Sequence, residues 1–550
     1  MSGMAGQDSD GSRFYGYQCG KIGCRVLGAD RAMPTPAAPR QILSKGPIMT
    51  RADQTPVDLP PASPRALEVE QNGINSIGVG ERRGRPRELF WPWFAANISV
   101  LGISYGAFLL GFGISFAQAV AVGVVGIVIS FLFCGLVSLS GKRGHAPTMT
   151  LSRAAFGVNG NRVPSAISWL LLVGWETVLA TLAVLATATV FTRLGGHSGF
   201  VDKLAALLLV AALVVIGGIL GFEFIMKLQM WITVITAVLT VVYVILVASD
   251  INFTTLAALP AGPVPQLIGG FVFMLTGFGL GWVNAAGDYS RYLPHRASSA
   301  GVVGWTTLGA SLGPVVLLII GLMLAGSSQQ LSEAVATDPI GALTTLLPTW
   351  FLIPFALVAV LGLVGGAVLD IYSSGIALLS VGLPVPRFVA AAIDGALMIA
   401  GSIYLVFIAD SFIGPFQGFL ITLGVLIAAW CGIFLGDFTL RRKPYASSEL
   451  LDPRGRYGSV RVASLVLLVI GTVIGWGLVT NSFASWLGWQ GYLLGPFGLG
   501  GREGSWAYAN LGVLAALIIG FVGTLLFGAR SVRAQEDKPL NDADQAAAAE

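Results

Sequence analysis

The strongest constraint on this chain is a succession of long apolar stretches that contain almost no charged residues. Only 11% of its 550 residues are charged, whereas a soluble domain carries about 25%. The charges gather near the two ends and in a few short connections. A helix of about 20 apolar residues spans the roughly 30 Å hydrocarbon core of a bilayer. The sequence therefore predicts an all-α integral membrane protein that is embedded in lipid.

The apolar stretches begin after Trp91 and number about twelve, which predicts about twelve transmembrane helices. They occupy residues 93–115, 118–139, 165–192, 203–222, 228–248, 264–286, 303–325, 350–379, 388–409, 412–436, 462–480 and 507–528.

The connections between these stretches differ in charge. With the N-terminus in the cytoplasm, the even-numbered connections contain Lys142, Arg143, Arg153, Arg162, Lys227, Arg291, Arg296, Arg387, Arg441, Arg442, Lys443, Arg454, Arg456 and Arg461. The odd-numbered connections contain only Arg193, Lys203 and Arg502. Because Lys and Arg accumulate in cytoplasmic loops, we expect a multi-pass plasma membrane protein with both termini in the cytoplasm.

The two ends of the chain differ in composition from the rest. Residues 1–88 are rich in Gly, Pro, Ser, Asp and Arg and lack a periodic apolar pattern, which predicts a disordered cytoplasmic tail. Residues 89–530 form the predicted transporter domain, and residues 531–550 a second cytoplasmic tail. Met49 opens a polar segment typical of a transporter N-terminus, which leaves open whether residues 1–48 belong to the natural protein.

Several function classes fit the sequence poorly. The net charge of +4 does not indicate nucleic acid, because the basic residues follow the apolar stretches and form no patch interleaved with aromatic residues. Cys19 and Cys24 lie far in sequence from the three histidines, so neither a metal site nor a cofactor is expected. No enzymatic nucleophile and base pair and no repeated channel filter is visible. A carrier remains.

Two glycine-rich runs interrupt the helix signal. They are Gly102-Ile-Ser104-Tyr105-Gly106 in the first span and Thr276-Gly277-Phe278-Gly279-Leu-Gly281-Trp282 in the sixth. The first and sixth spans are corresponding positions of two five-helix halves. Discontinuous helices at such positions indicate an inverted-repeat transporter with a binding site near the bilayer midplane.

Four segments together resemble a known family. They are Trp93-Phe94-Ala95-Ala96-Asn97-Ile-Ser99, Thr150-Leu-Ser152-Arg153-Ala-Ala-Phe156-Gly157-Val-Asn159-Gly160-Asn161, Gly281-Trp282-Val-Asn-Ala-Ala-Gly-Asp288-Tyr289-Ser290-Arg291-Tyr292 and Asp452-Pro453-Arg454-Gly455-Arg456-Tyr457-Gly458. In order and spacing, residues 89–530 resemble the nucleobase:cation symporter-1 family, purine-cytosine permease branch. The resemblance implies a 5+5 inverted-repeat fold with two extra C-terminal helices. It also implies import of a cytosine- or purine-type nucleobase together with a cation.

The resemblance assigns the substrate site to the third, first and sixth helices. In the family an aromatic residue of helix 3 and one at the break of helix 6 sandwich the base, and the matching positions are Trp175 and Trp282. Phe278, one turn away, is a neighbouring candidate, and Ser104 matches a position at the helix 1 break. Aromatic plates suit the π faces of a heterocycle.

Backbone groups and alternative roles complete this prediction. Broken helix ends around Gly279 and Gly281 are expected to offer amides and carbonyls to the edge of the base. Packing is the alternative role for Trp175, closure of the inner side of the site for Trp282, and helix capping for Ser104.

The sequence also departs from the family pattern. Leu179 replaces a polar side chain one turn after Trp175, and Gly365-Gly366-Ala367 replaces an asparagine in helix 8. Two acids lie nearby, Glu176 and Asp370, and acids inside a membrane are usually functional. Asp394, two turns into the ninth span, is expected to pair with a basic loop residue.

The residues of helix 8 indicate which cation is coupled to transport. Sodium-coupled relatives bind the ion between helix 1 carbonyls and helix 8 hydroxyls, but residues 351–369 contain no Ser, Thr or Asn. Burial favours the protonated form of a carboxyl, so Glu176 and Asp370 are expected to couple a proton instead. The missing polar residues leave open another heterocycle, such as a hydantoin, allantoin or a vitamin precursor. A ligand sensor on a transporter scaffold is the alternative from another function class.

Overall fold

The computed structural model describes residues 69–197, 199–409, 413–481, 485–540 and 544–545. Within these ranges every regular element is a helix and none is a strand. The described residues form one compact unit. The disorder predicted for residues 1–68 lies outside the described residues.

Ten helices in the described ranges are long and apolar enough to cross a membrane. They are α3 (Phe116–Gly144), α6 (Arg162–Arg193), α7 (Phe200–Leu220), α8 (Phe222–Val247), α10 (Val264–Gly277), α11 (Ser299–Ser327), α13 (Leu352–Val381), α14 (Arg387–Phe407), α15 (Ile413–Leu440) and α17 (Leu511–Glu536). The pair α1 (Phe90–Asn97) and α2 (Leu101–Leu110), bent by 65°, forms an eleventh span. The apolar helix α16 (Val462–Gly477) is shorter. Each predicted span therefore has a helical counterpart.

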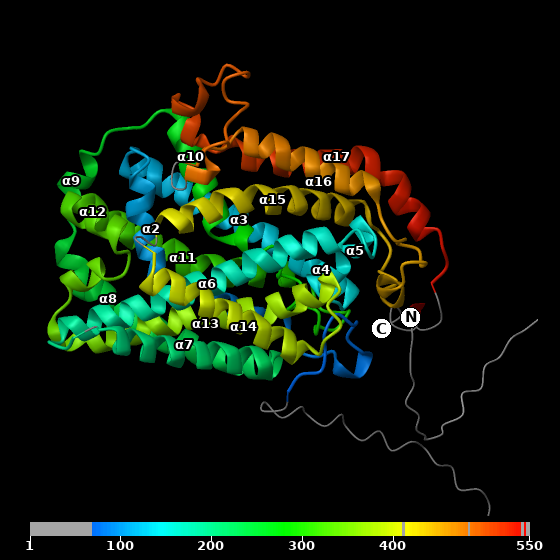
Figure 1. Cartoon of the computed structure of the whole chain (residues 1–550), viewed down its shortest axis with the longest axis horizontal. Helices are drawn as coiled ribbons and strands as arrows, with labels where there is room; N and C mark the ends of the chain where they lie inside the picture. The colour runs from blue at the N-terminus through cyan, green and yellow to red at the C-terminus, as the bar shows by residue number, and fades with distance from the viewer. Residues whose placement is uncertain (1–68, 198, 410–412, 482–484, 541–543, 546–550) are drawn as a thin grey trace, which may run out of the picture. The chain divides into compact units, whose positions relative to one another are not determined.

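The long helices lie side by side and run between two ends of the bundle (Figure 1). One end, here called the tail end, contains residues 69–89, the short helices α4 (Thr148–Leu151) and α5 (Arg153–Phe156), and the connection between α15 and α16. The opposite end, here called the far end, contains α9 (Phe253–Ala257) and α12 (Gln329–Thr337). The last helices, α16 and α17, pack on α15 along one side of the bundle.

The first span breaks earlier than its glycines suggested. α1 ends at Asn97 and α2 begins at Leu101, so the predicted run from Gly102 to Gly106 lies inside α2. A Cβ on Gly106 would overlap the backbone of Gly321 on α11. These small residues let two helix backbones touch, as is common in membranes. Close packing rather than a break explains this glycine run.

The sixth span breaks where the sequence predicted. α10 ends at Gly277, Phe278 has φ −122° and ψ −113°, and the 3-10 turn η4 (Gly279–Gly281) follows. The backbone N–H of Gly279 donates to Ser130 Oγ on α3 at 3.0 Å. A Cβ on Gly279 would overlap the backbone of Ser130. The break is therefore held against α3.

Both predicted tail boundaries differ from the observed contacts. Residues 69–88, assigned to the disordered tail, include Ile77, whose backbone N–H donates to the carbonyl of His145 at 2.7 Å. At the other end, α17 continues past residue 530 to Glu536, whose carboxylate accepts from the backbone N–H of Arg442 at 2.7 Å. Composition marks polar segments, but it does not reveal which of them dock on the bundle.

Candidate functional site

Trp175 on α6 faces the break in the sixth span. A Cβ placed on Gly281 would lie 3.0 Å from Trp175 Nε1, so glycine is needed for this close approach. The indole ring meets Phe416 and Phe419 of α15 edge to face, with centroids 5.6 and 6.4 Å apart. Its buried N–H has no hydrogen-bond partner. A buried indole N–H without a partner is costly, so a ligand acceptor would stabilise it.

Two further aromatic residues lie on either side of the same break. Phe278 packs beside Tyr105 of α2, with centroids 4.6 Å apart. Trp282 meets Trp93 of α1 edge to face at 5.8 Å, and Trp93 contacts Tyr289 at 5.6 Å. Phe278 thus packs against α2, and Trp282 packs against α1.

The remaining predicted site residues have other partners. Ser104 is fully buried, and its hydroxyl donates to the carbonyl of Pro339 in the connection after α12. The carbonyl of Gly279 accepts from Cys134 Sγ, and the N–H of Gly281 donates to the carbonyl of Phe278. The structure therefore brings Trp175 to Gly281 but does not bring Ser104 to them. It pairs both backbone groups of Gly279 and the N–H of Gly281.

The two predicted acids lie in the core with neighbours that differ. Glu176 on α6 accepts a hydrogen bond from Ser374 Oγ of α13 at 2.5 Å, while its Oε2 has no partner. Asp370 on α13 is buried, and its Oδ2 also has no partner. Neither acid forms an ion pair in the described part of the chain.

Asp394 and Ser374 extend this group of buried polar residues. Asp394 on α14 accepts from Trp169 Nε1 at 2.7 Å and lies 2.9 Å from Ser374 Oγ. The prediction that Asp394 pairs with a basic loop residue is therefore wrong. We call Glu176, Ser374, Asp394 and Trp169 the Ser374 cluster. The sequence signal for Asp394 was its position inside an apolar span, but Ser374 carried no signal of its own.

The two departures from the family pattern form one packing contact. A Cβ on Gly366 would lie 2.8 Å from Leu179 Cδ1 and 3.3 Å from the carbonyl oxygen of Ala96. A Cβ on Gly362 would lie 2.6 Å from the carbonyl of Ile98. The glycines of α13 therefore bring it against the C-terminal carbonyls of α1. Leu179 occupies the volume that a side chain at position 366 would need.

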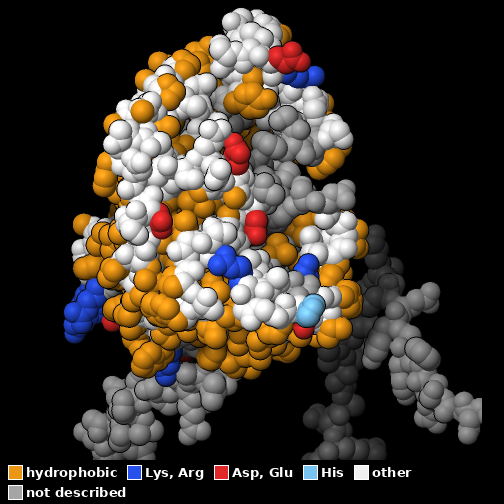
Figure 2. Space-filling view, turned by 90° about the vertical axis from the view of Figure 1, so that its left-hand side faces the viewer, with side chains coloured by type: hydrophobic (Ala, Val, Ile, Leu, Met, Phe, Trp, Pro, Cys, Tyr) orange, Lys and Arg blue, Asp and Glu red, His pale blue; other side chains and the backbone are white. Residues whose placement is uncertain are grey.

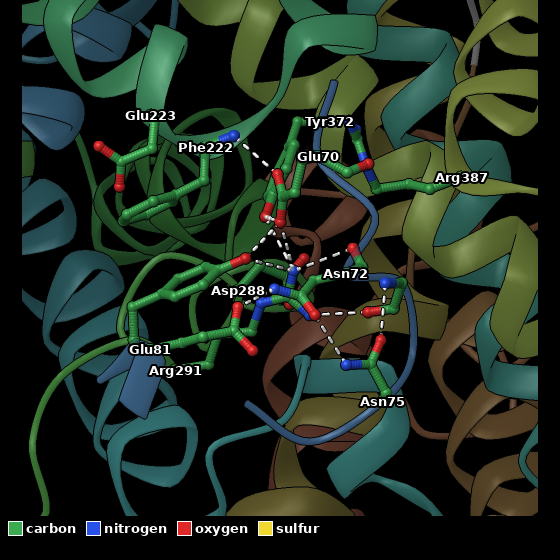
Figure 3. Close-up of polar contacts among 12 residues, drawn as sticks. Glu70, Asn72, Asn75, Glu81, Phe222, Glu223, Asp288, Arg291, Tyr372 and Arg387 are labelled. Carbon is green, nitrogen blue, oxygen red and sulfur yellow. Dashed lines mark hydrogen bonds and ion pairs between the residues drawn. The ribbon is translucent and has the colours of Figure 1, made fainter. Parts of the chain in front are cut away.

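The tail end is closed by a network around Glu70 (Figure 3). Glu70 Oε1 accepts from Arg291 Nη2 and from the Tyr372 hydroxyl, each at 3.1 Å, and from the Tyr292 hydroxyl. Its Oε2 accepts from the backbone N–H of Phe222 at 2.7 Å. The Arg291 side chain is fully buried. We call this set the tail-end network, and it joins the N-terminal segment to the segment after η4, to α8 and to α13.

Arg387 extends the closure to α14. Its guanidinium donates to the carbonyls of Gly218 and Ile219, each at 2.7 Å, and its Nε donates to the carbonyl of Glu70 at 3.4 Å. The N-terminal segment thus contacts helices from both halves of the bundle at the tail end.

Both ends of the bundle contain a cavity, and the smaller one, of about 370 Å³ at the tail end, is lined by Phe222, Tyr289 and Tyr292. The larger cavity, of about 590 Å³ at the far end, is lined by α2, α10, α12, α15 and α17 and by the connection between α16 and α17. Its wall includes the aromatic residues Phe108, Phe112, Phe273 and Tyr508 and reaches Thr276, just before the α10 break. The seven predicted substrate residues are not among its lining residues. Charged side chains are scattered singly over this end (Figure 2). The larger cavity therefore leads from the far end toward the α10 break.

Comparison with known proteins gives the same architecture. The profile of a family described as "Permease for cytosine/purines, uracil, thiamine, allantoin" matches residues 76–495. A Bacillus subtilis relative, YxlA, carries a purine-cytosine permease name. It is 22% identical over 432 residues, which cover 76% of this chain and 90% of that protein. The purine-cytosine permease FCY2 of Saccharomyces cerevisiae is 21% identical over 471 residues, covering 78% of this chain and 82% of its own.

A solved structure shares the fold. Mhp1, a nucleobase-cation-symport-1 family transporter in a closed conformation with bromovinylhydantoin bound, superposes with a TM-score of 0.63 at 17% identity. The match covers 88% of this chain and 99% of Mhp1. The fold is thus the helical transporter fold with discontinuous first and sixth spans. The chain belongs to the permease family for cytosine, purines, uracil, thiamine and allantoin, the purine-cytosine permease branch of the nucleobase:cation symporter-1 family.

Proposed function

We propose that this permease imports a nucleobase of the cytosine or purine type, or a similar small heterocycle, by alternating access. The observation that carries the proposal is Trp175, whose unpartnered indole N–H lies against the glycine break of the sixth span. An aromatic plate with a free donor beside a broken helix suits the face and edge of a heterocycle. The names of the relatives, together with the hydantoin bound to Mhp1, support this substrate class.

The proposed direction of transport follows from the two ends. Basic connections converge at the tail end, where Arg143 donates to the carbonyl of Arg441 and Arg153 to the carbonyl of Leu450. The positive-inside rule then assigns the tail end to the cytoplasm of a plasma membrane protein. The larger cavity opens to the outside, and the tail-end network closes the inner path, which is an arrangement ready to accept external substrate.

We further propose that the coupling cation is a proton. The first half of α13 has no side-chain oxygen between Leu352 and Leu369, and its glycines pack against the carbonyls of α1. A sodium ion needs several oxygen ligands in place of its water. Glu176 and Asp370, buried without ion pairs, support protonation as the coupling event.

A carrier of another heterocycle is the second candidate. The contact between Leu179 and Gly366 places apolar atoms where the family has polar side chains. This change favours a substrate whose hydrogen-bonding pattern differs from that of a nucleobase, such as a hydantoin or a vitamin precursor.

Uptake by proteoliposomes tests the proposed function. We expect one of radiolabelled cytosine, adenine, hypoxanthine, uracil, allantoin and hydantoin to accumulate above its external concentration, and unlabelled substrate to compete. Binding of a compound without accumulation by any of the panel would instead support a sensor.

A further inference from the structure

A single hydroxyl lies between two buried carboxyl groups in the Ser374 cluster. Ser374 Oγ is 2.5 Å from Glu176 Oε1 and 2.9 Å from Asp394 Oδ2. It is also 3.3 Å from the carbonyl of Ile371 on its own helix. The three groups come from α6, α13 and α14, which pack against one another. All three side chains are fully buried.

One added proton satisfies the hydrogen bonds of this cluster. A serine hydroxyl donates one hydrogen bond and accepts others. Two ionised carboxylates only accept, so Ser374 can satisfy one of them and leaves the other facing an oxygen lone pair. If one carboxyl is protonated, it donates to Ser374, and Ser374 donates to the other carboxylate. Both short contacts are then hydrogen bonds.

The surrounding charges offer no alternative to that proton. On α13, Asp370 is a further acid near Glu176, and the Tyr372 hydroxyl is engaged at the tail end by Glu70 and Arg291. The Tyr289 hydroxyl is engaged by Leu369 and Ser373. On α14 the guanidinium of Arg387 donates to backbone carbonyls at the tail end. The charged residues of α7 and α8, namely Asp202, Lys203, Glu223 and Lys227, lie toward the helix ends and are at least partly exposed.

The partner of Asp394 on the other side is neutral. Trp169 Nε1 donates to Asp394 Oδ1, while Glu176 Oε2 is fully buried and has no partner. Two buried like charges without a cation are costly in a low dielectric. That cost falls when one proton is shared between the two acids.

We propose that Glu176 and Asp394 form one proton site bridged by Ser374, with Asp394 as a coupling residue. This inference rests on the proposed proton symport and names its site. The pair binds one proton from the open far end and becomes singly charged, and it returns to two carboxylates when the proton leaves toward the tail end. The doubly charged state separates α6 from α14 by repulsion. Trp175 precedes Glu176 on α6, so the proton site adjoins the proposed substrate site along this helix.

Infrared difference spectroscopy of the purified full-length chain tests this pair without any substrate. The carboxylic acid carbonyl band is followed as a function of pH in the intact protein and in Asp394→Asn and Glu176→Gln. Each substitution removes the like charge that favours protonation of the other acid. We expect either one to shift the titration midpoint of the remaining acid to lower pH by about one unit or more, as for coupled groups.

Asp250→Asn is the control, because Asp250 is an exposed acid after the end of α8 and lies outside the Ser374 cluster. It should leave the midpoint of the pair within a few tenths of a pH unit. If one variant fails to fold, the reciprocal variant still gives the measurement. Unchanged midpoints in folded Asp394→Asn or Glu176→Gln overturn the shared site.

Uptake by the same proteins separates this inference from the proposed function. Asp394→Asn should exchange substrate across the membrane but lose at least tenfold in proton-driven accumulation, whereas Asp250→Asn should retain that accumulation. If the unmodified chain accumulates substrate under a sodium gradient and not under a proton gradient, the proposed proton symport is wrong. The shared proton site is then judged by the infrared titration alone. Proton-driven accumulation that is equal in Asp394→Asn and the unmodified chain removes Asp394 from the coupling.

Discussion

At the scale of single residues, the substrate proposal depends on Trp175. Its ring has edge contacts on one side and a buried N–H without a partner. The sequence identified this position through its family resemblance and its place within an apolar span. The same reasoning missed the Ser374 cluster, because a serine within an apolar helix has no distinctive pattern until its neighbours from two other helices are known.

Trp175→Ala should weaken binding of the accumulated heterocycle by about 1–3 kcal/mol, the scale for loss of base stacking on an aromatic side chain. Trp175→Phe should retain part of the affinity, because it keeps a π face. Trp305→Ala, at an exposed tryptophan of α11, is the control. Equilibrium binding to purified protein gives the comparison. Unchanged affinity in folded Trp175→Ala would transfer the stacking role to Phe278 and Trp282.

His145 gives a pH effect that is separate from transport. Burial, reinforced by the charge of Arg82, lowers the pKa of His145 to about 4. The unfolded chain binds a proton at this histidine near pH 6.5, but the folded chain does not until about pH 4. The folded state should therefore lose stability between these values as pH falls. His145→Gln should reduce this loss of stability, measured as the drop in thermal unfolding midpoint from pH 7 to pH 5. If the drop is unchanged in the variant, other groups cause it.

At the scale of elements, glycines have two functions that a sequence pattern does not separate. Gly279 and Gly281 mark a real helix break, whereas Gly102 and Gly106 lie within α2 and pack on α11. The number and order of the spans were predictable, because hydropathy alone marks them. The position of the first break was not, because it depends on which backbone the glycines approach.

Gly321→Ala on α11 should destabilise the contact with α2, because its Cβ would overlap the carbonyl oxygen of Ile103. Overpacking of this kind costs roughly 1–3 kcal/mol. Gly304→Ala on the same helix is the control, since nothing lies within 4 Å of its Cβ position. Thermal unfolding in detergent should show a lower midpoint for the first variant only. Equal midpoints would mean that α2 and α11 are less closely packed than the approach of Gly321 to Ile103 indicates.

The N-terminal segment is the second element with a testable role. A chain that starts at Met49 retains Glu70 and should transport normally, whereas Glu70→Gln should weaken the tail-end network by removing a charge from Arg291. We expect faster thiol labelling of a cysteine placed at Ser373 from the tail side in the Gln variant. Glu81→Gln, at an exposed acid of the same segment, is the control. Equal labelling rates in both variants would show that Glu70 does not close this end.

At the scale of the whole molecule, the two ends set the direction of transport. A cysteine at Arg454, which is exposed at the tail end, should react with an impermeant thiol reagent only in inside-out vesicles. One at Gly495, exposed in the connection between α16 and α17, should react only from the outside. The reverse pattern would invert the proposed orientation.

The central proposal for the whole molecule is that a proton drives heterocycle uptake. The most direct measurement is accumulation of the transported compound by proteoliposomes under an imposed pH gradient or an imposed sodium gradient. We expect accumulation to follow the pH gradient, to collapse with a protonophore and to be unaffected when potassium replaces sodium. Glu176→Gln should still exchange substrate but should not concentrate it. Accumulation that requires sodium and survives the protonophore would contradict the proposal.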